Sequence, residues 1–110
     1  MAKVKTNIEA GVCGFKTEVT ANSEDTQNVS FNIVTDCEKI GKLAKELTEV
    51  DAYNEIKEGF EGKLYGIIRK NLTGCCSGCA VPVGIFKTMQ VAANLALLKD
   101  ITIKMKKEEQ

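Results

Sequence analysis

Histidine and tryptophan are absent from this 110-residue sequence, and proline occurs once. Without histidine the chain cannot form a Ser-His or Cys-His catalytic pair, and a metal site must use thiolate or carboxylate ligands. Two tyrosines and four phenylalanines leave little surface for stacking on nucleic-acid bases. Because 15 basic and 15 acidic side chains cancel, no net charge attracts nucleic acid or an anionic membrane.

The sequence also has little that would direct it to a membrane. The N-terminal MAKVKTNIEA lacks the apolar core of a signal peptide, and the apolar run VAANLALL is far too short to cross a bilayer. We therefore expect a cytoplasmic protein that folds as a single domain over residues 1–110, with a solvated tail at 106–110. In a reducing compartment its five cysteines are expected to be thiols or ligands rather than disulfides.

Alternating apolar and polar residues in the first third predict three β-strands. The alternation covers residues 4–10, 15–21 and 29–33, and the connections are a GVCG turn and the polar loop ANSEDTQN. Strands joined by such short connections favour an antiparallel meander.

The apolar spacing then changes to the period of a helix. Apolar residues at positions 40, 43, 44 and 47 predict an amphipathic helix, and Thr35 with Glu38 forms a capping-box pattern that places Cys37 in its first turn. Asp51 is expected to cap a short second helix that ends near Gly59.

Two more helices and a strand are expected after Gly59. Apolar positions over 64–72 predict a third helix, and a fourth begins at Pro82, runs to Leu97 and is apolar nearly all round, which predicts burial. Residues 101–105, ITIKM, alternate again and predict a final strand. The predicted fold is therefore two-layer α+β: a three-stranded antiparallel meander, helices packed on one face and a C-terminal strand.

The stretch GCCSGCAVP, residues 74–82, holds three of the five cysteines. Every cysteine is predicted at the end of an element: Cys13 in the first turn, Cys37 after the third strand, and Cys75, Cys76 and Cys79 before the last helix. In a meander the first turn and the exit of the third strand lie at the same end of the sheet. If the last helix begins at that end too, thiols from three distant segments meet there.

Four converging thiols suit a soft or borderline metal, because zinc and iron–sulfur clusters are both held by four cysteines. Cys76 and Cys79 form a CxxC pair, while Cys75 is expected to point to the opposite side of the loop. The dipole of the following helix should lower the pKa of Cys79. The predicted ligands are Cys13, Cys37, Cys76 and Cys79, with Asp36 or a water as a substitute.

The order of these motifs resembles that of the NifU/IscU-type iron–sulfur scaffold proteins. They too place one cysteine in a Cys-Gly turn after the first strand, one at a helix start after the third strand, and one at the N-terminus of a late helix. By this resemblance Cys13, Cys37 and Cys79 take those positions. Small TSCPD-type domains have a similar layout, with GCAVP where they carry Ser-Cys-Pro.

The motifs Cys-Gly-Phe, Asp-Cys and Cys-x-Val-Pro also resemble those of an uncharacterised family of small bacterial and archaeal proteins, over residues 4–98. Compared with the scaffold proteins, Phe15 replaces an aspartate that assists cluster release, the late cysteine has no histidine beside it, and ITIKM has no counterpart in their core. The resemblance with these departures implies a site that holds zinc or an iron–sulfur cluster firmly, with Cys76 as the fourth ligand.

Two other functions stay open. A thiol redox or sulfur-handling protein would cycle Cys76 and Cys79 between dithiol and disulfide, although the βαβ setting of thioredoxin is missing. Alternatively the thiols are inert and the chain is an interaction module, because cysteine is among the most buried residue types. The GxGxxG and P-loop patterns are absent, so an enzyme is not the favoured class. A protein partner and a homodimer are both left open.

Overall fold

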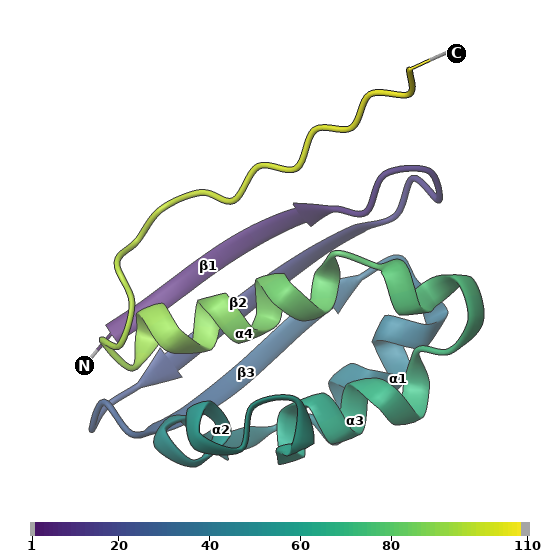
Figure 1. The fold of residues 1–110 in the computed structure, drawn as a ribbon. Helices are drawn as coiled ribbons and strands as arrows, with labels where there is room; N and C mark the ends of the chain where they lie inside the picture. The colour runs from purple at the N-terminus through teal and green to yellow at the C-terminus, as the bar shows by residue number, and fades with distance from the viewer. Residues whose placement is uncertain (1, 109–110) are drawn as a thin grey trace.

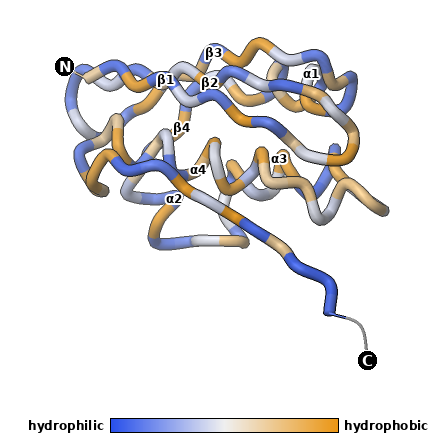
Figure 2. The backbone as a smooth tube through the Cα atoms, turned by 90° about the horizontal axis from the view of Figure 1, so that it is seen from above, coloured by the Kyte–Doolittle hydropathy of each residue, from blue (hydrophilic) through white to orange (hydrophobic). Residues whose placement is uncertain are grey.

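The computed structural model describes residues 2–108 and consists of a four-stranded sheet with helices packed on it (Figures 1 and 2). The strand order is β1-β2-β3-β4, and every neighbouring pair is antiparallel. The predicted α+β class and the meander of the first three strands are confirmed. The strands are β1 (Ala2–Glu9), β2 (Lys16–Ser23), β3 (Asn28–Thr35) and β4 (Glu49–Asp51).

The helices follow the meander, and Figure 1 shows α4 lying along β1 and β2 while the others gather beside β3. One face of the sheet is apolar and forms the core with them. On this face β2 contributes Val19 and Ala21. They belong to the same core as Leu43, Ile85 and Met89 from the helices, and none of these five side chains is exposed. The helices are α1 (Glu38–Glu46), α2 (Ala52–Glu58), α3 (Lys63–Asn71) and α4 (Val81–Ala92), with 3₁₀ turns η1 (Gly59–Glu61) and η2 (Gly74–Gly78).

The buried position of α4 follows from its sequence, as predicted. Pro82 lies in its first turn, where a backbone N–H has no helical partner. Gly84 allows close approach to β1, because a Cβ at this position would collide with the side chain of Ile8. The Thr88 hydroxyl oxygen lies 2.7 Å from that of Thr6 and ties the helix to the strand.

By length and composition alone, residues Gly74–Ala92 could also cross a membrane. The buried face that α4 presents to β1 and β2 is the usual reason for such a composition in a core helix.

The end of α4 lies before the predicted Leu97. Asn94 adopts a left-handed conformation with φ of 64°, its N–H donates to the Val91 carbonyl at 3.0 Å, and the Leu95 N–H donates to the Gln90 carbonyl at 2.8 Å. These two bonds form a Schellman motif, which satisfies the last carbonyls and turns the chain out of the helix. Asparagine tolerates this backbone conformation better than most residues.

The predicted strand at 101–105 is not formed in the single chain. Residues 96–108, which we call the arm, are extended and lie outside the sheet (Figure 1). The turn after α4 sends the arm past the outside of β1, where it makes no ladder with the sheet. Of the tail predicted at 106–110, residues 106–108 are exposed, and 109–110 lie outside the part of the chain that the structure describes.

Two carboxyl groups cap the middle helices. Asp51 precedes α2 and accepts a hydrogen bond from the Asn54 N–H at 3.2 Å, which confirms its predicted role. Glu55, only 1% exposed, accepts from the Leu64 N–H at 2.8 Å and so caps the first turn of α3. The sequence did not predict this second cap, because the two residues lie in different helices.

Candidate thiol site

The five cysteines lie in three loops at one end of the sheet (Figure 1). The β1–β2 turn and the exit of β3 share this end because the strands are antiparallel. η2 leads into α4 at the same end, which meets the condition on which the predicted convergence depended. The fold therefore brings together segments separated by most of the chain.

Cys13 lies in the β1–β2 turn and is exposed. The turn closes through a hydrogen bond of 3.1 Å from the Ala10 N–H to the Phe15 carbonyl. Gly11 and Gly14 have φ of 92° and 75°, a conformation that favours glycine. Cys13 is thus carried on an exposed turn between two glycines.

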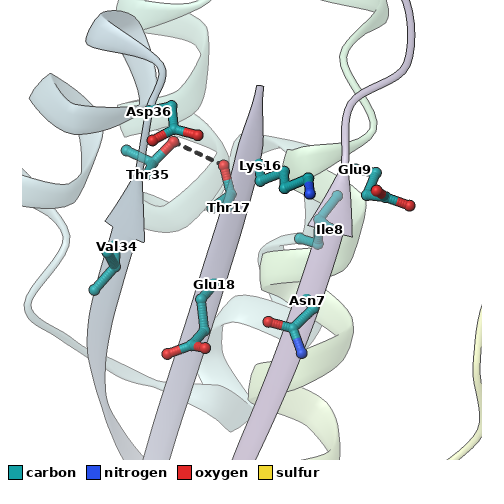
Figure 3. A pocket seen from close by; sticks show the side chains of 9 residues that line it. All are labelled: Asn7, Ile8, Glu9, Lys16, Thr17, Glu18, Val34, Thr35 and Asp36. Carbon is teal, nitrogen blue, oxygen red and sulfur yellow. Dashed lines mark hydrogen bonds between the residues drawn. The ribbon is translucent and has the colours of Figure 1, made fainter. Parts of the chain in front are cut away.

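Cys37 is half-buried and stands at the N-cap of α1, one position before the helical turn in which the sequence placed it. Its N–H donates to the Thr35 hydroxyl at 3.1 Å, and that hydroxyl lies 2.8 Å from the hydroxyl of Thr17 on β2 (Figure 3). Among the residues that the structure describes, no side chain caps α1 in the manner of the predicted capping box. Thr35 instead holds the backbone of Cys37 against the sheet.

The remaining three cysteines lie in or just after η2. The Cys79 N–H donates to the Cys76 carbonyl at 3.1 Å, which closes the CxxC into a compact turn. Cys76 and Cys79 are half-buried and contact the edge of the core, whereas Cys75 is exposed. The two members of the adjacent pair therefore have different surroundings, with Cys75 on the solvent side.

Burial raises the pKa of the Cys79 thiol. The Val81 N–H at the start of α4, 3.4 Å from the Cys79 sulfur, acts in the opposite direction. The predicted lowering of the Cys79 pKa is therefore wrong in sign, because the loss of hydrating water outweighs the hydrogen bond from the helix.

Nearby thiols raise the pKa of Cys79 further, because a negative charge on them disfavours a second one. The thiols that act in this way are those of Cys13, Cys37 and Cys76. They are the same residues that the sequence grouped with Cys79, and Cys75 is not among them.

The four thiols are neighbours without standing in ligating geometry. Over residues 2–108, no three cysteine, aspartate or glutamate side chains are arranged to hold a metal ion. A shared metal would therefore require the sulfurs to move toward one another. The exposed, glycine-flanked Cys13 turn is the segment best able to make such a movement.

A shallow depression of about 450 Å³ lies at the same end of the sheet (Figure 3). Most of its lining is polar and comes from the first three strands and the residue after β3; it includes Glu9, Lys16, Glu18 and Asp36, while Ile8 and Val34 are apolar. Asp36, the predicted substitute ligand, belongs to this depression, and its N–H donates to the Lys16 carbonyl at 3.2 Å. Because most of these side chains are charged or polar, the depression resembles ordinary hydrated protein surface.

The model of a protein family described as a family of unknown function, DUF6951, matches residues 4–105. The chain belongs to this family. The match includes all five cysteines and most of the arm. No curated protein and no solved structure matches the chain.

Membership in DUF6951 agrees with the predicted likeness to an uncharacterised family. The likeness to NifU/IscU-type scaffolds and to TSCPD-type domains finds no support, because no solved structure matches. The arguments about function below therefore depend on the residues of this chain and not on those families.

Proposed function

We propose that this protein binds zinc or an iron–sulfur cluster through Cys13, Cys37, Cys76 and Cys79. The main support is that Cys79 lies within electrostatic reach of three thiols from three separate loops. A negative charge on any of these three neighbours makes the ionisation of Cys79 harder when no cation is near. A bound cation reverses this penalty, because its positive charge stabilises all of the thiolates that ligate it.

The donor set limits which metals fit. Thiolates select soft or borderline metals such as Zn²⁺ and iron in sulfur clusters, and the chain has no histidine to bring other metals into competition. A single zinc ion would draw its four sulfurs to within about 4 Å of one another, since Zn–S bonds are about 2.3 Å. A cluster spreads its ligands over several iron atoms and would need a smaller inward movement of the loops.

The four cysteines would have different roles in binding. Cys76 and Cys79 lie in one compact turn, so they offer a preformed pair. Cys37 is held at the N-cap of α1 by the Thr35 hydroxyl and has a fixed position. Cys13, on its glycine-flanked turn, would close onto the metal last.

The raised pKa of Cys79 counts against Cys79 as the attacking thiol of a redox pair. A redox-active cysteine attacks as the thiolate, and the reactive member of a CxxC usually has a lowered pKa. Burial raises the pKa of the Cys79 thiol, which reduces the fraction of Cys79 that is thiolate. The metal-binding proposal meets no such difficulty, because the metal itself displaces the proton.

The test begins with anaerobic purification, followed by an absorption spectrum and elemental analysis. Protein stripped of metal is then titrated with cobalt(II), whose thiolate complexes absorb strongly by charge transfer from sulfur. We expect the wild type and Cys75→Ser to bind alike. Serine at position 13, 37, 76 or 79 should weaken binding by at least about tenfold, because a four-thiolate site loses a ligand.

Cys75→Ser is the matched control, since it removes a thiol from the same loop without touching the group around Cys79. Wild-type binding by both Cys13→Ser and Cys37→Ser would show a local CxxC chelate and contradict a site that joins the loops. A metal-free wild type that takes up neither cobalt nor iron and sulfide would leave the redox or inert-thiol function standing.

A further inference from the structure

The arm, residues 96–108, leaves large apolar side chains in water. Leu97, Leu98 and Met105 are 90%, 80% and 91% exposed, and Ile103 is 66% exposed. Within residues 2–108, the arm makes no hydrogen bond between backbone groups; the last such bond along the chain is the one from the Leu95 N–H that closes α4. Extended backbone with alternating apolar residues and free hydrogen-bonding groups is what an added strand requires.

The centre of the arm is complementary to itself. Its sequence Asp100-Ile101-Thr102-Ile103-Lys104 gives the same polar and apolar pattern in both directions, with opposite charges at the two ends. If two copies pair antiparallel about Thr102, Asp100 of each lies opposite Lys104 of the other, and Ile101 lies opposite Ile103. Opposite charges and apolar pairs at directly facing positions both stabilise antiparallel strands.

A groove beside the arm supplies the surface that such a pair would need. Its volume is about 650 Å³, and it lies between the free edge of β1, one face of α4 and residues 98–103 of the arm. On α4 the groove is lined by Val83, which is 48% exposed, and by the half-buried Val91, with Lys87 and Thr88 between them along the helix.

We propose that the arm is a dimerisation element, and that the arms of two copies of this chain pair antiparallel about Thr102. The apolar side of the paired arms lies against the grooves formed by β1 and α4 of the two copies. A two-stranded ribbon is marginal in water by itself, so this support from Val83 and Val91 is part of the proposal.

Two features favour a second copy over another partner. Complementarity of a segment with itself is what a two-fold interface requires, since each copy presents the same surface. The arm also runs in roughly the direction of β1 and then leaves the body of the molecule toward residue 108, where another copy can reach it (Figures 1 and 2).

The test measures the dissociation constant of the full chain by sedimentation velocity over a range of concentrations. The wild type should form a dimer. Asp100→Lys and Lys104→Asp should each weaken it about tenfold, because each places like charges at both facing pairs of the dimer. An equimolar mixture of these two variants should regain the wild-type affinity, since a mixed dimer again faces opposite charges at both pairs. Lys39→Asp makes the same charge change as Lys104→Asp at an exposed position of α1; it is the matched control for that variant and should leave the constant unchanged.

Thr102→Pro provides an independent variant. Among the described residues 2–108 the arm makes no hydrogen bonds between backbone groups, so this variant should fold normally while its ladder with the second arm is broken. A wild type that stays monomeric at every concentration would overturn the proposal and leave the arm lying along its own chain. A dissociation constant unchanged by Thr102→Pro would overturn it as well. So would an equimolar mixture of the two charge variants that dimerises no more tightly than either variant alone.

Discussion

Removing the side chain of Glu55 should destabilise the protein far more than neutralising it. Glu55 is buried, and its carboxyl oxygen caps α3 through the Leu64 N–H at 2.8 Å. Glu55→Ala leaves that buried donor unpaired, at about 1–3 kcal/mol. It also removes one packed methylene group, at about 0.8 kcal/mol. The two terms together predict a loss of about 2–4 kcal/mol in the free energy of unfolding.

Glu55→Gln keeps an acceptor oxygen of the same size in the same place, so it should cost less than about 1.5 kcal/mol. Urea unfolding followed by circular dichroism measures both losses, provided that the free energy of unfolding depends on urea concentration with the same slope in the variants and the wild type. For a chain of this size, the alanine variant should melt at least about 8 °C below the wild type. Equal losses for the alanine and glutamine variants would show that the cap contributes little and refute the reasoning.

Gly62 allows a further test of the same contact. A Cβ at Gly62 would stand 2.7 Å from the Glu55 oxygen that caps α3, so Gly62→Ala should displace the cap. In the Glu55→Ala background this conflict is gone, and the second substitution should cost clearly less than in the wild type. Additive losses in the double-mutant cycle would mean that the two positions do not act through one contact.

Two further predictions concern pH and metal. Hydrogen bonds from the Asn28 and Gln27 N–H groups lower the pKa of Asp25 from 3.8 to about 2, so its contribution to stability is present above pH 3.8 and lost as the pH falls toward 2. When the free energy of unfolding is measured at a series of pH values, it should fall less steeply for Asp25→Asn than for the wild type between pH 3.8 and 2. Parallel curves for the two proteins would contradict this. Chelation or mild acid should lower the melting temperature of metal-loaded wild type by several degrees and that of Cys37→Ser much less, because bound metal stabilises only the folded state. Equal responses to chelator in the two proteins would count against Cys37 as a ligand.

Elements set by local patterns could be predicted from the sequence. The three long strands follow from alternation, and Asp51 and Pro82 mark where α2 and α4 begin. The placement of the cysteine loops at one end of the sheet followed from antiparallel topology, because successive strands must return to the same ends.

The features that the sequence did not predict depend on contacts between distant parts of the chain. β4 has three residues, too few for an alternation to be visible, and it forms because β3 offers a free edge. The alternation in ITIKM correctly indicated extended backbone, but alternation does not say whether a partner strand exists. The sign of the Cys79 pKa shift depends on how deeply the start of α4 is buried. A prediction made from the helix dipole alone leaves out this loss of hydration.

The hydrogen bond between Thr6 and Thr88 has a consequence for the order of folding. It joins residues 82 positions apart, whereas the meander joins near neighbours through tight turns. Closing a long loop costs more chain entropy than closing a hairpin, so the docking of α4 on β1 is expected to follow the formation of the sheet. Cys79 enters with α4, and its distance from Cys13 and Cys37 is set only at that late step. A nascent chain would therefore expose the Cys76–Cys79 pair as a weak, two-thiol chelate before the four thiols meet. Any metal captured early would be held loosely and exchanged freely until the last helix has docked.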